Sequence, residues 1–125
     1  MSGWYQLTLL SLSKTKITSL PSSIGKCEKL KKINLEECKN INALPKSLGE
    51  LNKLVELNIK SSSVRELPES IGSCSKLEVL ECEKSELVDL PESVSKLSKL
   101  KYLNVSGVKF PSSQPLEKAI KCEKL

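Results

Sequence analysis

Apolar residues recur along this chain in one fixed pattern. The pattern is Leu-x-x-Leu-x-Leu, followed after about eight residues by a Leu-Pro pair. The Leu-Pro pairs begin at Leu20, Leu44, Leu67 and Leu90, with spacings of 24, 23 and 23 residues. A fixed period of about 20 to 29 residues with this leucine spacing predicts a solenoid of stacked coils.

Within each copy, two apolar residues alternate with polar ones, as in a short strand with one buried face. These pairs are Leu10 and Leu12, Ile33 and Leu35, Leu57 and Ile59, Leu80 and Cys82, and Leu103 and Val105. Equivalent strands of successive coils predict a parallel sheet. After two of the Leu-Pro pairs a Glu follows, in Pro68-Glu69 and Pro91-Glu92, which favours the start of a short helix or 3-10 turn on the far side.

The full pattern resembles leucine-rich repeats from about Trp4 to Phe110. One copy consists of Leu54, Leu57, Ile59, Ser62, Val64 and Leu67. The motif LPxSIGxLxKL is similar to that of intracellular plant immune receptors, Ras-associated leucine-rich repeat proteins, and bacterial surface and effector proteins. The resemblance implies an α/β fold, a leucine-rich repeat solenoid with a concave parallel β-sheet of about five short strands and convex short helices or 3-10 turns.

We expect a single domain over residues 1–125. The repeats lie near residues 4–19, 20–43, 44–66, 67–89 and 90–112, and residues 113–125 form a C-terminal cap or a partial repeat. Trp4 is a candidate for covering the first repeat. Because the chain begins and ends partway through a repeat, we expect a segment of a longer solenoid.

The family's usual Asn after the strand is replaced here by shorter or apolar residues. They are Thr15, Cys38, Ser62, Ser85 and Val108. Asn offers both a donor and an acceptor to adjacent coils, whereas Ser or Thr offers less and Val offers nothing. We expect a weaker hydrogen-bond ladder in this loop, weakest at Val108.

Composition argues against catalysis. Histidine is absent, and the chain has no Gly-rich phosphate loop and no nucleophile beside a base. Glu81 and Glu83 flank Cys82 and form a carboxylate pair, but nothing in the sequence supplies the pocket that would perturb one of them. We therefore expect no enzyme activity, no catalytic residue and no cofactor.

The five cysteines fit the repeat as small buried side chains. Their number is odd, and no two of them are separated by two residues, so neither a disulfide framework nor a zinc site is expected. Neither end resembles a secretory signal, and no apolar run approaches the roughly 18 residues of a membrane helix. The expected location is cytoplasmic, with a secreted effector as the alternative.

The exposed strand positions predict the binding surface. Stacked coils align them in columns about 4.8 Å apart: Leu9, Lys32, Glu56, Val79 and Tyr102; Ser11, Asn34, Asn58, Glu81 and Asn104; Ser13, Glu36, Lys60, Glu83 and Ser106. Lys32 with Glu56, and Lys60 with Glu36 and Glu83, are expected to form cross-strand ion pairs. Tyr102 beside Val79 is the candidate anchor. The predicted partner-binding residues are Lys32, Asn34, Glu56, Asn58, Val79, Glu81, Glu83, Tyr102 and Asn104.

A basic stripe offers a second candidate surface. It consists of Lys29, Lys53, Lys76, Lys99 and Lys124, each just before the first strand leucine. Solubility alone explains such a stripe, and an acidic or phosphate-bearing partner is the alternative. Nucleic acid is not expected, because Glu is plentiful and no aromatic residues interleave with the lysines.

We predict a protein–protein interaction module that recognises a protein partner through the concave sheet. The resemblance implies a sensor, scaffold or effector role. The alternative is the substrate-recruiting domain of a larger enzyme such as a bacterial ubiquitin ligase. Neither membrane insertion nor a small-molecule substrate is expected.

Overall fold

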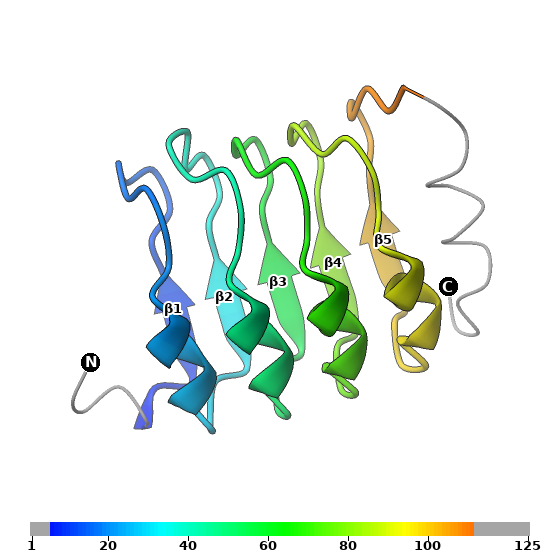
Figure 1. Ribbon diagram of the computed structural model, residues 1–125. Coiled ribbons are helices and arrows are strands. Elements are labelled where there is room, and N and C mark those ends of the chain that lie inside the picture. Colours follow the sequence, from blue (N-terminus) through cyan, green and yellow to red (C-terminus); the bar gives the residue numbers. More distant parts are fainter. Residues whose placement is uncertain (1–5, 112–125) are drawn as a thin grey trace.

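A computed structural model describes residues 6–111, in which five parallel strands form one sheet in the order β1-β2-β3-β4-β5. The strands are β1 (Leu9–Ser11), β2 (Lys32–Asn34), β3 (Glu56–Asn58), β4 (Val79–Glu81) and β5 (Tyr102–Asn104). They lie side by side along the axis of a solenoid (Figure 1). The predicted α/β leucine-rich repeat architecture is confirmed.

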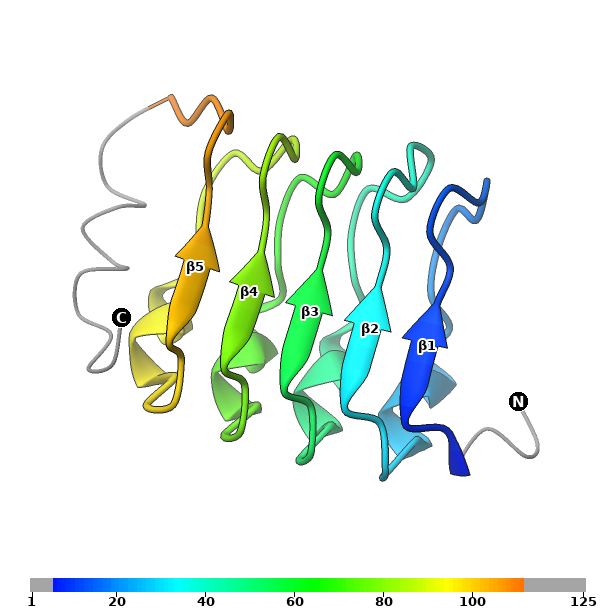
Figure 2. The ribbon, with the colours of Figure 1, turned by 180° about the vertical axis from the view of Figure 1, so that it is seen from behind.

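Four 3-10 helices lie on the side of the solenoid away from the sheet. They are η2 (Ser22–Lys26), η3 (Lys46–Glu50), η4 (Glu69–Ser73) and η5 (Glu92–Lys96). Figure 2, turned by half a rotation, shows the strands in front and the helices behind them. We number the coils by their strands, so that coil 1 contains β1 and η2, coil 2 β2 and η3, coil 3 β3 and η4, coil 4 β4 and η5, and coil 5 β5.

Proline sets the start of each helix. Pro68 and Pro91 occupy the N-cap position with extended backbone, and Glu69 and Glu92 are the first helical residues. Because proline has no N–H and its φ is restricted, it ends the extended segment without losing a hydrogen bond. Each helix closes with one tight turn, as where the Leu51 N–H donates to the Leu48 carbonyl. The prediction of short turns on the convex side is confirmed.

The strand register is the one that the repeat predicts. Lys32 pairs with Glu56, and Glu56 pairs with Val79. Backbone bonds continue the ladder past the strands, since the Glu37 N–H donates to the Lys60 carbonyl at 2.8 Å and the Ser61 N–H to the Glu83 carbonyl at 2.8 Å. The columns of exposed residues are therefore real neighbours in space.

The core is a continuous column between the sheet and the helices. Leu57 and Leu80 of the strands and Ile71 of η4 are fully buried. At the two ends, Leu12 and Leu103 pack against this core but are only partly buried. Each coil thus covers the leucines of its neighbours, as expected of a solenoid.

The loop after each strand has a weak side-chain ladder, as expected. The Cys38 thiol donates to the Leu12 carbonyl of coil 1 at 3.0 Å, whereas the Ser62 hydroxyl only accepts the Val64 N–H at 3.4 Å. The Ser85 hydroxyl is buried without a hydrogen-bond partner among the described residues. Backbone hydrogen bonds therefore provide most of the hydrogen bonding between coils in this loop.

One residue in every coil adopts a left-handed backbone at the turn after the strand. These residues are Lys14, Glu37, Ser61, Lys84 and Gly107, with φ between 55° and 73°. Only Gly107 signals this conformation in the sequence, because glycine alone adopts it without steric cost. The proposed caps, Trp4 and residues 113–125, lie outside the described residues.

Candidate protein-binding face

The outer face of the sheet brings together all nine residues predicted to bind a partner. Lys32 and Tyr102 are exposed, and the other seven are partly buried. Tyr102 is 47% exposed, and Leu9, at the opposite end of the same column, is 54% exposed. These are two of the three large apolar side chains with high exposure within residues 6–111. Apolar contact area is therefore available at both ends of a polar sheet face.

The central column also has a structural role that the strand pattern alone does not predict. The side-chain oxygens of Asn34, Asn58 and Asn104 each accept the backbone N–H two residues further along, at 2.8 to 2.9 Å. Glu81 does the same for the Glu83 N–H at 3.0 Å. These side chains hold the chain where it leaves the strand, as in an Asx turn. In the sequence, three Asn at the same repeat position are the signal that points to this role.

A polar cluster surrounds Tyr102. The tyrosine hydroxyl lies 3.4 Å from Glu81 Oε1. Asn104 Nδ2 lies 3.3 Å from Glu81 Oε1, 3.4 Å from Glu83 Oε1 and 3.2 Å from the Tyr102 hydroxyl. Glu81 of β4 and the Tyr102 and Asn104 side chains of β5 are thus one another's cross-strand partners. Three of the four contacts are longer than a typical hydrogen bond, and the Asn104 amide is shared among three oxygens.

Only part of the expected ion-pair pattern forms. Lys60 Nζ lies 3.8 Å from Glu83 Oε1. Within the described coils, neither Lys32 with Glu56 nor Glu36 with Lys60 approaches within the 4.0 Å of an ion pair. Pairs of this exposure contribute at most about 1 kcal/mol. Lys32 and Glu56 are consequently available to an external partner.

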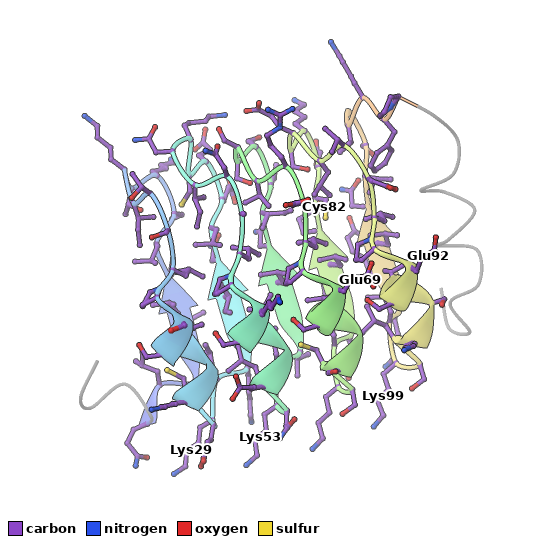
Figure 3. The ribbon with its side chains drawn as sticks, viewed as in Figure 1. Lys29, Lys53, Glu69, Cys82, Glu92 and Lys99 are labelled. Atoms are coloured by element: carbon purple, nitrogen blue, oxygen red, sulfur yellow. The ribbon has the colours of Figure 1, made fainter. Side chains whose placement is uncertain are left out.

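The basic stripe lies along an edge of the solenoid and not on the sheet. Lys29, Lys53 and Lys99 follow one another along this edge (Figure 3), and Lys76 is exposed at the same repeat position. The Lys29 ammonium donates to Gln6 Oε1 at 2.9 Å. Lys124 lies outside the described residues. The stripe and the sheet face are thus two distinct surfaces.

The described cysteines are inert packing residues. Cys27, Cys38, Cys74 and Cys82 are buried and free. Burial raises the pKa of the Cys74 thiol to about 11. Burial, reinforced by the charge of Glu81, raises the pKa of Cys82 further, and Figure 3 shows this side chain inside the coil. A thiol with a raised pKa is a poor nucleophile and a poor metal ligand.

Residues 6–111 contain no cluster of three side chains suited to a metal ion. None of the helices in that range has the length and apolar character needed to cross a bilayer. The sheet face presents an aromatic ring, amides and carboxylates.

Comparison with known proteins agrees with this geometry. The family model described as Leucine Rich Repeat matches residues 6–27. A leucine-rich repeat protein of Leptospira interrogans superposes with a TM-score of 0.81 at 23% identity, over 94% of this chain and 36% of that one. The chain therefore has the fold of a leucine-rich repeat solenoid, and its residues 6–27 match the family model. No curated protein matches its sequence.

Two further structures share the fold of this chain. The functional domain of InlJ from Listeria monocytogenes, which includes a cysteine ladder, has a TM-score of 0.76 at 22% identity, over 93% of this chain and 24% of that one. The plant peptide hormone receptor RGFR1, in complex with RGF2, has a TM-score of 0.70 at 21% identity, over 85% and 22%.

The chain covers only part of the length of these structures. It spans 36% of the Leptospira chain and under a quarter of each of the other two. The likeness to these structures, at 21 to 23% identity, is one of fold.

Proposed function

We propose that this chain recognises a protein partner through the outer face of its sheet, with Tyr102 and Val79 as the apolar anchor. The observation that carries the proposal is the exposure of Tyr102, at 47%, beside polar groups that restrain its hydroxyl. Exposed aromatic residues in a polar surround are the side chains that most often dominate binding energy.

The polar cluster supports this role because it orders the ring before binding. Tyr102 contacts Glu81 and Asn104, and Asn104 in turn accepts the Ser106 N–H at 2.9 Å. A side chain that is already ordered loses less conformational entropy on binding. The plant receptor that shares this fold was solved with RGF2 bound, so such solenoids do bind partners.

The size of the face limits what it achieves alone. Five strands about 4.8 Å apart span about 20 Å, a small footprint against the roughly 800 Å² that each partner contributes to a standard interface. We propose that these coils are one part of a longer binding surface. Buried free thiols favour a reducing, cytoplasmic setting, in a sensor, scaffold or effector.

The test uses two variants on the face and two on the edge. Partners captured from a cell extract are identified and purified, and their affinity is then measured by calorimetry. Tyr102→Ala and Glu81→Asn should each weaken binding at least fivefold, or about 1 kcal/mol. Asn is the residue that coils 2, 3 and 5 carry at this position, so it preserves the turn while removing the charge.

Lys53→Glu and Lys76→Glu are the matched controls, since both lysines are exposed on the edge. They should leave the affinity within twofold of the original. If the lysine variants abolish binding and the face variants do not, the basic stripe is the site and the proposal is wrong. Thermal midpoints of all four variants should stay near that of the unmodified chain.

A further inference from the structure

A groove on the side of the solenoid away from the sheet crosses coils 2, 3 and 4. We propose that it binds a short segment of a partner protein in which basic side chains alternate with apolar ones. This site is separate from the sheet face and does not depend on the function proposed for that face.

The groove is open and has a volume of about 540 Å³. Such a volume lies within the range of about 300 to 1,000 Å³ typical of ligand sites. Its apolar lining comes from the Leu-Pro pairs of coils 3 and 4, Leu67-Pro68 and Leu90-Pro91, and from Ala43 and Leu44 of coil 2. The three leucines and Pro91 are themselves nearly fully buried, so Ala43 and Pro68 provide most of the apolar surface that is open in the groove.

Ala43 explains why the groove opens at coil 2. The residue before the Leu-Pro pair is Ser19, Glu66 or Asp89 in the other coils but Ala43 in coil 2. Ala43 pairs with Glu66 through an isolated bridge, so the two backbones lie close together. Because the side chain of Ala43 ends at the Cβ, it does not close the groove on the coil 2 side.

The far side of the groove carries carboxylates. Glu66, Glu69 and Asp89 line it, and all three are exposed. Asp89 Oδ1 accepts the Leu90 N–H at 2.7 Å, and Glu69 Oε1 accepts the Glu92 N–H at 3.2 Å. Backbone bonds thus hold two of the carboxylates in place. The Glu66 carboxylate forms no ion pair within residues 6–111.

The sequence around these carboxylates is rich in acidic residues. Residues 54–96 contain nine of the fifteen acidic residues but only five of the twenty basic ones. This region is therefore negative although the chain as a whole has a charge of +5. Charge complementarity favours a basic occupant, and the open apolar surface of Ala43 and Pro68 favours apolar side chains between the basic ones.

Lys46 makes the two ends of the groove differ in charge. It lines the coil 2 end, at the repeat position that Glu69 and Glu92 occupy in coils 3 and 4. Figure 3 shows Glu69 and Glu92 next to each other on the helix side, on η4 and η5. A bound segment should therefore place its basic side chains over coils 3 and 4, away from Lys46.

The test uses three short synthetic peptides of equal length, with Arg alternating with Leu, Arg alternating with Ser, and Glu alternating with Leu. Each is titrated into the isotopically labelled chain, and backbone amide shifts are followed by NMR. The Arg/Leu peptide should shift the amides of Ala43, Glu66 and Ser70, and should bind at least tenfold tighter than either of the other two.

Variants that keep the fold then test the charges. Glu66→Gln with Asp89→Asn retains the side-chain acceptors and should weaken the Arg/Leu peptide about tenfold. Lys46→Glu should tighten it. Glu28→Gln with Glu50→Gln removes the same charge at two exposed positions outside the groove, so it is the matched control and should leave the affinity for the Arg/Leu peptide within twofold.

Three results would overturn the proposal. The first is an Arg/Leu peptide that shifts only amides of the sheet face, such as those of Glu81 and Tyr102. The second is equal binding of the Arg/Leu and Arg/Ser peptides, which would show charge attraction without the groove. The third is concentration-dependent dimerisation of the chain alone that Glu66→Gln abolishes, which would make a second copy the occupant.

Discussion

Gly49 of η3 packs directly against Ser70 of η4. A Cβ atom added to Gly49 would lie 2.5 Å from the Ser70 carbonyl oxygen and 2.6 Å from the Ser70 Cβ. Ser70 in turn donates its hydroxyl to the Lys46 carbonyl at 2.6 Å, which ties the two helices together. Glycine is thus needed for the close spacing of successive helices, although its backbone there is not left-handed.

Replacing Gly49 by Ala should destabilise the chain by about 1 to 3 kcal/mol, because the new methyl group forces η3 and η4 apart. Urea unfolding followed by circular dichroism measures the change. Ser95 of η5 stands at the equivalent position and already carries a Cβ, so Ser95→Ala is the control and should cost under about 0.5 kcal/mol. Equal effects of the two variants would show that the contact is not the cause.

Ser61→Gly should stabilise the chain by about 0.5 to 1 kcal/mol, because Ser61 has a φ of 55° that glycine adopts without strain. The measurement is again the free energy of unfolding in urea. Ser73→Gly, in η4 where φ is negative, is the control and should destabilise. Loss of stability in both variants would contradict the assignment of strain to the turn.

The buried thiols should make stability fall above about pH 8.5. Cys74 has a pKa of about 11 in the folded chain and Cys82 a still higher one, whereas a thiol in the unfolded chain ionises near pH 8.5. Between those values the unfolded chain releases protons that the folded chain retains, so unfolding is favoured as pH rises. Each thiol should contribute up to about 1.4 kcal/mol per pH unit.

Comparison of the unmodified chain with Cys82→Val isolates this effect. From pH 8.5 to 10.5 the variant should lose less stability per pH unit, while between pH 6 and 8 the two curves should run parallel. Identical slopes at high pH would mean that the Cys82 thiol ionises as readily in the folded chain as in the unfolded one.

Asn58→Ala should destabilise by about 1 kcal/mol, because Asn58 Oδ1 accepts the Lys60 N–H at 2.8 Å in a partly buried site. Thermal or urea unfolding measures the loss, and Asp at this position should restore most of it since a carboxylate also accepts. Asn52→Ala, on the exposed edge, is the control. If Asn58→Ala leaves the free energy of unfolding unchanged, this hydrogen bond does not stabilise the fold. The column would then serve partner binding alone.

The sequence by itself determined the solenoid, the five strands and their register. It could do so because a repeat such as Leu54, Leu57 and Ile59 buries its apolar residues only when the next coil places Leu77, Leu80 and Cys82 beside them. Residues one period apart must then be neighbours. The columns on the sheet, including Val79 beside Tyr102, follow from that rule alone.

The tertiary structure alone decided how individual side chains are used. Glu81 serves at once as an acceptor for the Glu83 N–H and as a contact of Tyr102, and Ser61 is left-handed without being glycine. The groove likewise depends on the small side chain of Ala43 beside Glu66. A repeat pattern fixes which residues face each other, but hydrogen-bond partners, backbone strain and open volume depend on distances of a few tenths of an ångström between coils. Those distances arise only when all the coils pack together.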